Sequence, residues 1–432
     1  MVDISVSPQA ARRFILAKQG LLDTAGAGGV RAWRRELTGR EGALAAIHRL
    51  RAVQIDPMTI VAPNHDLALR ARVKDYNGSF LNDFLSAGEV FEYWANARCI
   101  IPIAEFPHFY PKMIRARENI REKRQELLPV MEDVVKALRE QGPSRSRDVG
   151  NDGPRLSGVG WNPTTKESKA SVRALDYLLQ EGRIMVCRRD GNEKYYCLTN
   201  DHLPAQVRAE LPADSNGKSP PDRVEQSQTD KADGSRELIL AYLDAFALAT
   251  RDHRFGWQKI KAQEKGEVLS QLQAEGHVAS VTVDSIKDPY FALAEDLPVL
   301  TKAEGWKPSP TVHILPPLDN LLWSRPRLED LWGFEYRWEV YMPAKTRRFG
   351  PYTMPILEGD TFIARADLKS DRSGGALLVN ILHFEEGVDI TSQRIEGIGA
   401  ALEDLALYLG LKKITLGRVH PEHAAAGLKR LL

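Results

Sequence analysis

Two polar side chains lie close together in an otherwise apolar stretch near the N-terminus. The run at 53–73, VQIDPMTIVAPNHDLALRARV, contains Gln54 and Asp56 at positions i and i+2. In an extended chain such residues point to the same side, so an amide and a carboxylate can converge on one substrate atom. A carboxylate placed there can act as a general base, and an amide can position the water that it activates. The spacing leaves a structural alternative open, in which Asp56 caps the turn at Pro57 and Gln54 satisfies backbone groups.

The surrounding pattern predicts the elements that position this pair. Apolar residues recur at helical spacing over 42–52, which predicts a helix leading into the pair. Pro57 cannot continue a helix or donate a hydrogen bond to a sheet, so the pair is expected at a junction between helix and extended chain. Further upstream, Ser7 as N-cap and Pro8 at the first helical position predict a helix that ends at Gly20.

The first half of the chain is expected to contain two related domains. Residues 1–128 predict a winged-helix-like domain that carries the polar pair, because three expected helices and a small extended element fit that unit. Over 129–212, two helices precede the β-rich runs RIMVCRR and KYYCL, which the turn sequence DGN at 190–192 joins into a hairpin. Two helices followed by a two-stranded wing are typical of a second winged helix. A similar order over 236–307 predicts a third.

Composition separates the remaining parts of the chain. Residues 213–235 are almost free of large apolar side chains and rich in Ser, Asp, Gly and Pro, so we expect a flexible linker or loop there. Over 308–432, short β-rich runs separated by turn residues predict a small β-barrel with C-terminal helices. One of these runs, RWEVYMP at 337–343, alternates like a strand. The predicted fold class is α+β, with tandem winged-helix domains followed by a small C-terminal β-barrel.

Charge and cysteine content exclude several classes of protein. The net charge of the 432 residues is +1, so any nucleic-acid-binding surface must be local rather than general. The cysteines Cys99, Cys187 and Cys197 form no C-x-x-C pair, and we expect reduced thiols without a structural zinc site. No apolar run reaches the length of a membrane span and no signal-peptide core is present, so we expect a cytoplasmic protein without a membrane partner.

Several segments resemble one known family. These are VQIDP, the following PNHDLALRAR, the stretch EYWANA, and above all LWGFEYRWEVYMPAKTRRFGPYTMPILEGDTFIARADLKSDR at 331–372. Together they resemble the YcaQ/AlkZ family of winged-helix DNA glycosylases, over most of the chain except the expected linker. Within that family the Gln-apolar-Gln form is typical of the AlkZ branch and Gln-apolar-Asp of the YcaQ branch. Gln54 and Asp56 match the second form.

The resemblance implies hydrolysis of the N-glycosidic bond of N7-alkylguanine, including guanines crosslinked between strands. The implied partner is double-stranded DNA that carries such a lesion, bound by a monomer near the nucleoid. Asp56 would be the base for the attacking water, and Gln54 would position that water. No lysine nucleophile is needed, which implies a monofunctional enzyme without strand cleavage. We expect no cofactor and no metal.

Further residues are candidates for contact with substrate or DNA. His65 could line the same pocket or be an ordinary partly buried histidine. Tyr93 and Trp94 could stack on a base or fill the space that it leaves, although aromatic residues at such a place are often core. Asn96 stands where the resembled family often has histidine, so it could bond to phosphate or base but not titrate. The candidates for phosphate contact in the C-terminal part are basic: Arg337, Arg347, Arg348, Lys369 and Arg372.

A function of another class would use the same elements. A winged-helix transcriptional regulator with a ligand-sensing barrel would have the same fold and the same basic patches without catalysis. In such a regulator Gln54 and Asp56 would have no function, whereas in a glycosylase they would be catalytic. This difference distinguishes the two hypotheses.

Overall fold

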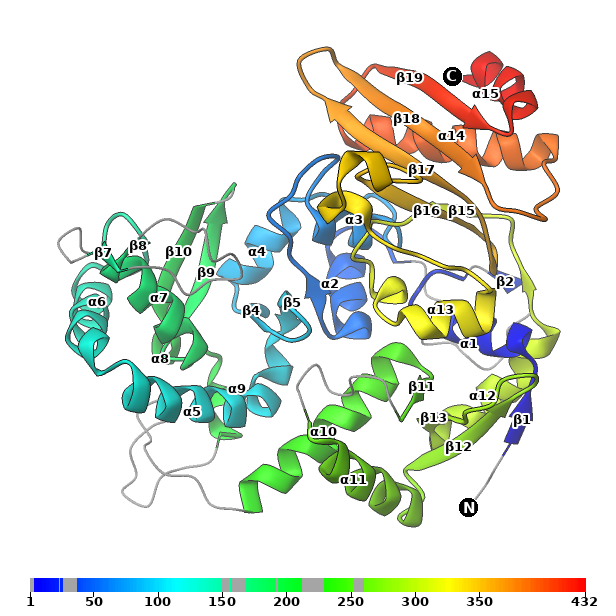
Figure 1. Ribbon diagram of the computed structural model, residues 1–432. Helices are drawn as coiled ribbons and strands as arrows, with labels where there is room; N and C mark the ends of the chain where they lie inside the picture. Colours follow the sequence, from blue (N-terminus) through cyan, green and yellow to red (C-terminus); the bar gives the residue numbers. More distant parts are fainter. Residues whose placement is uncertain are drawn as a thin grey trace. The chain divides into compact units, whose positions relative to one another are not determined.

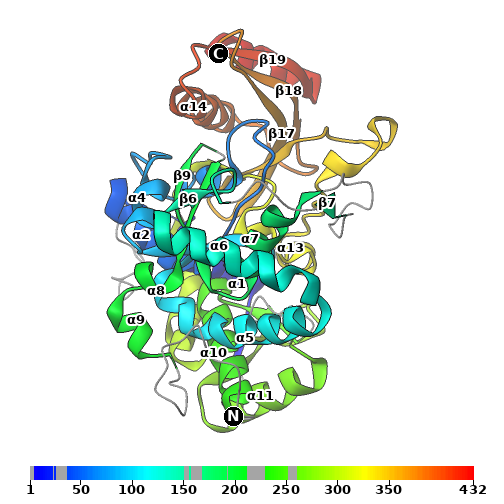
Figure 2. The same cartoon turned by 90° about the vertical axis from the view of Figure 1, so that its left-hand side faces the viewer.

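The computed structural model describes residues 4–22, 24–25, 37–149, 155–156, 168–191, 193–211, 229–251 and 260–432. Figure 1 shows the helices and strands, and Figure 2 shows them turned by 90°. The fold is α+β, as the sequence predicts. No helix in these ranges is both long and apolar enough to cross a membrane.

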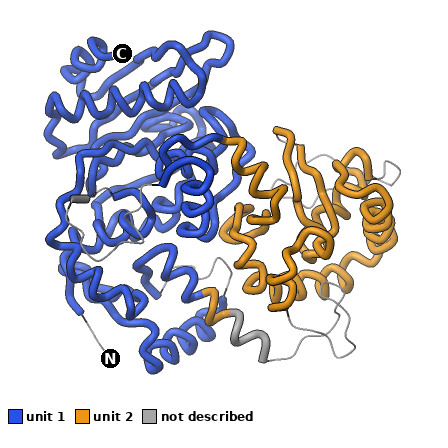
Figure 3. The backbone as a smooth tube through the Cα atoms, turned by 180° about the vertical axis from the view of Figure 1, so that it is seen from behind, with its two compact units in different colours: residues 1–77, 239–432 blue, residues 78–238 orange. Residues whose placement is uncertain are grey.

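The chain forms two compact units, which Figure 3 colours separately. Unit 1 contains residues 1–77 and 239–432, and unit 2 contains residues 78–238. The predicted domain 1–128 is therefore shared between the units, and the predicted boundaries inside each unit stay predictions. Residues 213–228 of the expected linker lie outside the described residues, and from Thr229 the chain is already in helix α10 (Thr229–Phe246).

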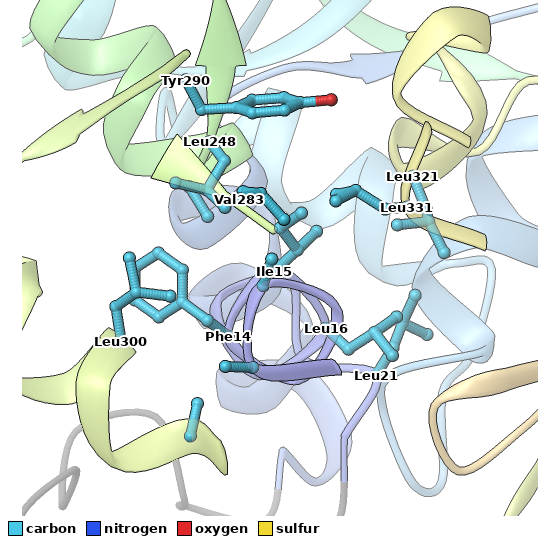
Figure 4. Packing of buried hydrophobic residues seen from close by; sticks show 14 of the residues in the cluster. Phe14, Ile15, Leu16, Leu21, Leu248, Val283, Tyr290, Leu300, Leu321 and Leu331 are labelled. Atoms are coloured by element: carbon cyan, nitrogen blue, oxygen red, sulfur yellow. The ribbon is translucent and has the colours of Figure 1, made fainter. Parts of the chain in front are cut away.

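The first helix of unit 1 packs on a sheet built largely from distant sequence. Helix α1 (Pro8–Lys18) begins as predicted, because the Ser7 hydroxyl accepts a hydrogen bond from the Ala10 amide at 3.1 Å. Strand β1 (Ile4–Val6) pairs in parallel with β12 (Val278–Val283), and the sheet continues through β13 (Tyr290–Leu293) to β11 (Ala249–Thr250). Figure 4 shows the resulting core around α1, with side chains of this sheet and of later helices.

The polar pair lies between two helices of unit 1. Helix α2 (Gly39–Leu50) ends where Arg51 adopts the left-handed conformation, with φ of 55°. Strand β3 (Val53–Gln54) follows, and after a loop comes helix α3 (Asn64–Arg70). The predicted junction between helix and extended chain is therefore confirmed.

The C-terminal part of unit 1 is an open five-stranded sheet. Its order is β15 (Val312–Ile314), β16 (Thr353–Glu358), β17 (Thr361–Asp371), β18 (Ala376–Phe384) and β19 (Lys413–His420). Strand β19 runs parallel to β18, and helix α14 (Ser392–Tyr408) makes the crossover between them. Within the described ranges β15 and β19 remain edges, so the closed barrel expected from 308 onward is not found.

Helix α14 explains why this sheet does not need to close. Its residues Ile398, Leu402 and Leu405 are buried in one core with Leu377, Val379 and other sheet residues. Both views show α14 along one face of the sheet (Figures 1 and 2). A sheet whose apolar face is covered by a helix satisfies its core without curling on itself.

The loop before β16 also differs from the prediction. The run at 337–343 is not a strand, because Glu339–Tyr341 forms a single 3₁₀ turn. The alternation of side chains therefore does not hold there: Glu339 is buried, whereas Tyr341 is exposed.

Unit 2 contains the predicted hairpin. Strands β9 (Ile184–Asp190) and β10 (Glu193–Leu198) pair antiparallel, and β6 (Ser144–Arg145) joins at the free edge of β10. Helices α6 (Leu128–Gln141) and α7 (Ala170–Gln180) precede the hairpin in the expected order. A second hairpin, β4 (Val90–Trp94) with β5 (Arg98–Pro102), lies between α4 (Phe80–Ser86) and α5 (Phe106–Lys123).

The remaining elements are short or connect these parts. In unit 2 they are β7 (Arg155–Leu156), β8 (Ser168–Lys169), α8 (Thr199–His202) and α9 (Ala205–Ala209). In unit 1 they are β2 (Thr24–Ala25), α11 (Ala262–Ala274), α12 (Leu297–Lys302), β14 (Lys307–Pro308), α13 (Arg325–Trp332) and α15 (Ala425–Leu431).

Candidate active site

Asp56 follows β3 directly and closes a tight turn. Its Oδ1 accepts a hydrogen bond from the Met58 amide at 2.8 Å, across Pro57. This is the contact that the structural alternative predicts for Asp56. It engages one carboxylate oxygen, and the other oxygen accepts no hydrogen bond from any residue that the structure describes. The turn therefore fixes the carboxylate while leaving one oxygen for a further partner.

The surroundings of Asp56 make its carboxylate more basic than usual. Partial burial raises its pKa above the ordinary 3.8, and the hydrogen bond from Met58 opposes that shift. No basic side chain of the described residues contributes to lowering it. Desolvation without a neighbouring cation disfavours the charged form of an acid. A carboxylate with a raised pKa in a polar pair suits a general base.

Two buried asparagines hold the backbone on which the pair stands. The Asn320 side chain donates to the carbonyl of Ala52 at 2.8 Å, and the Asn64 side chain donates to the carbonyl of Gln54 at 3.0 Å. The Asn64 amide oxygen also accepts from the Leu318 amide at 3.1 Å. Both asparagines are 1% exposed. The segment around 318–320 therefore fixes the position of β3.

A buried ion pair anchors that segment in turn. The Arg72 guanidinium donates to both carboxylate oxygens of Asp319, at 2.6 and 2.8 Å, and both side chains are 0% exposed. Arg72 also donates to the carbonyls of Gln19 and Ala68, each at 2.7 Å. A bidentate pair with additional hydrogen bonds has one preferred geometry. The ion pair therefore ties the asparagine-bearing segment to the end of α3.

An aromatic group from the C-terminal part of unit 1 lies beside Asp56. The rings of Trp338 and Tyr341 meet edge to face at 5.6 Å, and those of Trp338 and Tyr352 at 6.2 Å. Burial first, and then the charge of Asp56, raise the pKa of both Tyr341 and Tyr352. Tyr352 also shares a core with Val61 and Ala62, and Trp338 packs against that core, so the aromatic group lies next to the segment that follows Asp56.

The loop that carries Tyr341 is braced from within. The buried Glu339 carboxylate accepts hydrogen bonds from the amides of Arg348, Phe349 and Gly350, at 3.0, 2.9 and 3.0 Å. The Arg347 guanidinium donates to the carbonyls of Glu339, Met342 and Val340 at 2.9 to 3.2 Å. Arg347, which the sequence suggested for phosphate contact, is thus engaged inside this loop.

The other basic candidates are exposed. Arg337, Arg348, Lys369 and Arg372 are all solvent-exposed, and within the described ranges none of them forms an ion pair. Arg348 lies over the ring of Phe349, at 4.7 Å from its centroid. These four side chains remain accessible to an anionic partner.

His65 lies in α3, close to the pair in sequence. It is buried, with its Nε2 at 3.7 Å from Oδ1 of Asp66. That carboxylate accepts a hydrogen bond from the Tyr76 hydroxyl at 2.7 Å. His65 therefore belongs to a polar cluster in the interior of unit 1.

Tyr93, Trp94 and Asn96 belong to unit 2, at the end of the β4–β5 hairpin. Tyr93 is buried, and its hydroxyl donates to the carbonyl of Gln180 at 2.7 Å. Trp94 is half-buried, and the Arg98 guanidinium lies 5.1 Å from its ring centroid. Asn96 is exposed in the turn. The side chain of Tyr93 is thus part of the core of unit 2, whereas Asn96 is open to contact.

The arrangement of side chains offers no obvious place for a metal. In the ranges that the structure describes, no group of three or more His, Cys, Asp or Glu side chains is arranged to hold an ion.

The sequence predicts Gln54 and Asp56 as a polar pair, but it does not identify the residues that fix their backbone. Asn64, Asp319 and Asn320 received no role, although they share the signal that identified the pair, namely polar side chains inside apolar runs (VAPNHDL and LPPLDNLL).

The site thus combines a carboxylate of raised pKa with buried amides that fix its backbone, and comparison with known proteins places the chain in a family. The chain belongs to the AlkZ-like family of DNA glycosylases: the family model described as DNA glycosylase AlkZ-like matches residues 47–408, which include both the polar pair and the aromatic group. The solved structure of Streptomyces sahachiroi DNA glycosylase AlkZ matches with a TM-score of 0.60 and 13% identity, over 96% of this chain and 100% of that one. At this identity the likeness shows a common fold. The family implies DNA as the substrate.

Proposed function

We propose that this protein hydrolyses the N-glycosidic bond of N7-alkylguanine in DNA, including guanines in interstrand crosslinks. The observation that carries this proposal is Asp56, which lies two residues from Gln54 in a member of a DNA glycosylase family. Its carboxylate has a raised pKa, and one of its oxygens accepts no hydrogen bond from the part of the chain that the structure describes. The Gln-apolar-Asp form is our reason for assigning the chain to the YcaQ-like branch.

One carboxylate is sufficient for this substrate. Enzymes that cleave glycosidic bonds usually need a second carboxylic acid to protonate the leaving group. An N7-alkylguanine already carries a positive charge, so it departs without that proton. Water attacks C1′, the C1′–N9 bond breaks, and its electron pair neutralises the base. Asp56 takes the proton of the water and opposes the positive charge that develops on the sugar, while the Gln54 amide orients the water. The products are a free alkylated base and an abasic sugar.

The proposal also assigns the contacts with DNA. The exposed Arg337, Arg348, Lys369 and Arg372 would bind phosphates, and Asn96 would contact the backbone or a base. Three winged-helix domains, over 1–128, 129–212 and 236–307, would hold the duplex. His65 would support the pocket from the interior of unit 1, and Tyr93 and Trp94 would support DNA binding from unit 2, where they are buried and half-buried. The enzyme acts as a monomer, without metal or cofactor.

The test is base release from a duplex with a defined lesion. The wild-type protein should release N7-methylguanine in the presence of a chelator and leave an abasic strand that breaks only after alkali treatment. Release that needs added metal would contradict the mechanism, and strand cleavage without alkali would contradict its monofunctional form. Selective binding to an undamaged operator sequence, with no release, would instead support a winged-helix regulator.

A further inference from the structure

Tyr341 is an exposed aromatic side chain whose ring contacts Trp338, in the part of unit 1 that packs against the segment after the proposed catalytic Asp56. Its exposed fraction is 79%, and it is the only aromatic among the large apolar side chains that are exposed within the described ranges. A single exposed aromatic is ordinary on a protein surface. Tyr341 differs because several specific hydrogen bonds hold the turn that carries it.

The brace of the loop sets the position of Tyr341. The Glu339 carboxylate is buried, which is costly for a charged group unless hydrogen bonds replace its water. Three backbone amides supply those bonds, and the Arg347 guanidinium satisfies three carbonyls on the same turn. Two charged side chains thus specify a turn whose exposed member is Tyr341. The packing of unit 1 does not explain the position of Tyr341, because its ring buries little surface.

The neighbours of Tyr341 suit a positively charged aromatic ligand. One side of the group is aromatic, since Tyr341 meets Trp338 at 5.6 Å and Trp338 meets Tyr352 at 6.2 Å. On the other side, Tyr352 shares a core with Val61 and Ala62, and Trp338 packs against that core, so the segment that follows Asp56 lies next to the aromatic group. Burial first, and then the negative charge of Asp56, raise the pKa of Tyr341. A cation over an aromatic face is attracted by the ring quadrupole, and the attraction grows when water is excluded. A cationic purine between the Tyr341 ring and the Asp56 carboxylate would be attracted by both groups. A neutral purine would lack both of these charge-dependent interactions.

We propose that Tyr341 is a specificity-determining residue that stacks on the damaged base and distinguishes cationic alkylpurines from neutral guanine. This inference rests on the proposed function, because it uses Asp56 as the centre of the site. It extends that function by naming the residue that selects the charge state of the substrate.

Binding can test this inference separately from catalysis. The probe is a duplex with N7-methylguanine on a 2′-fluorinated sugar, in which the electron-withdrawing fluorine slows bond cleavage, compared with the same duplex carrying guanine. The ratio of the two dissociation constants measures selection for the cationic base. The variants are Tyr341→Phe, which keeps the ring, and Tyr341→Leu, which removes it. Leu407→Ala serves as the control, because Leu407 is 77% exposed in the same unit.

Tyr341→Leu should lower the preference for the cationic base by about tenfold, within the range of a cation–aromatic contact. Tyr341→Phe should keep it within about twofold, and so should Leu407→Ala. An unchanged preference in Tyr341→Leu, with base release intact in the wild type, would overturn the inference alone. Absence of base release together with a preference that Tyr341→Leu abolishes would overturn the proposed hydrolysis and support the recognition role. A wild-type protein with neither release nor preference would overturn both.

Discussion

Replacing Asn64 by alanine should release the strand that carries Gln54. The Asn64 side chain makes two good hydrogen bonds, one to the Gln54 carbonyl at 3.0 Å and one from the Leu318 amide at 3.1 Å. Because Asn64 is 1% exposed, water cannot readily replace it. The substitution therefore removes a hydrogen bond from the Gln54 carbonyl in the interior and one from the half-buried Leu318 amide.

The expected loss of stability follows from those two groups. An unsatisfied buried donor or acceptor costs about 1–3 kcal/mol, so the two together cost roughly 2–6 kcal/mol. Asn64 is the first residue of α3, where the backbone amides have no partner within the helix. The difference in helix propensity between asparagine and alanine should therefore contribute little to the change in stability. Most of the effect should come from the lost hydrogen bonds.

Urea unfolding gives the magnitude, and hydrogen exchange gives the location. The amide of Leu318 should lose protection in Asn64→Ala, because its acceptor is gone. Asn119→Ala is the matched control: Asn119 also donates to a backbone carbonyl, that of Arg115 at 2.9 Å, but it is exposed. A loss below about 1 kcal/mol, similar to that of the control, would refute the reasoning from buried hydrogen bonds.

Three further predictions concern charges. Asp319→Ala should destabilise unit 1 by about 3–5 kcal/mol in thermal or urea unfolding, because it leaves the Arg72 guanidinium buried without its partner. Burial alone would raise the pKa of Glu92, but the charges of Arg189 and Arg98 lower it below the ordinary 4.5. The ion pair of Glu92 with Arg189 therefore stabilises unit 2 at neutral pH. That contribution should disappear as pH falls through the lowered pKa, and Glu92→Gln should remove this pH dependence from the unfolding curve. Base release should decline as pH falls through the raised pKa of Asp56, since only its ionised form accepts a proton, and a single-turnover pH profile measures this.

Local patterns in the sequence predicted local structure well. Ser7 caps α1 as expected, and β9 and β10 pair as the predicted hairpin. The junction after α2 also lies where the helical pattern breaks before Pro57. These features depend on neighbours within a few residues, so the sequence contains the whole signal.

Features that depend on distant pairing could not be predicted in this way. Nothing in β1 indicates that Ile4 lies opposite Val281, and the spacing of β-rich runs does not distinguish an open sheet from a closed barrel. The same limit applies to the site. Asp56 and Tyr341 are far apart in the sequence, and only the fold brings the segment after Asp56 into one core with Tyr352 and Trp338, whose ring contacts that of Tyr341.

The central claim is that Asp56 activates the water that releases the base. Single-turnover release of N7-methylguanine should therefore be compared between the wild type and Asp56→Asn. The asparagine can still accept the hydrogen bond from Met58, so the turn and the affinity for DNA should persist. Asp371→Asn is the control, because Asp371 also accepts a turn hydrogen bond, from Gly374 at 3.0 Å, but that bond lowers its pKa, whereas the pKa of Asp56 is raised.

We predict that Asp56→Asn lowers the release rate by about 10²–10⁴-fold with unchanged DNA binding, while Asp371→Asn stays within about twofold of the wild type. Release by Asp56→Asn at the wild-type rate would contradict the assignment of Asp56 as the general base.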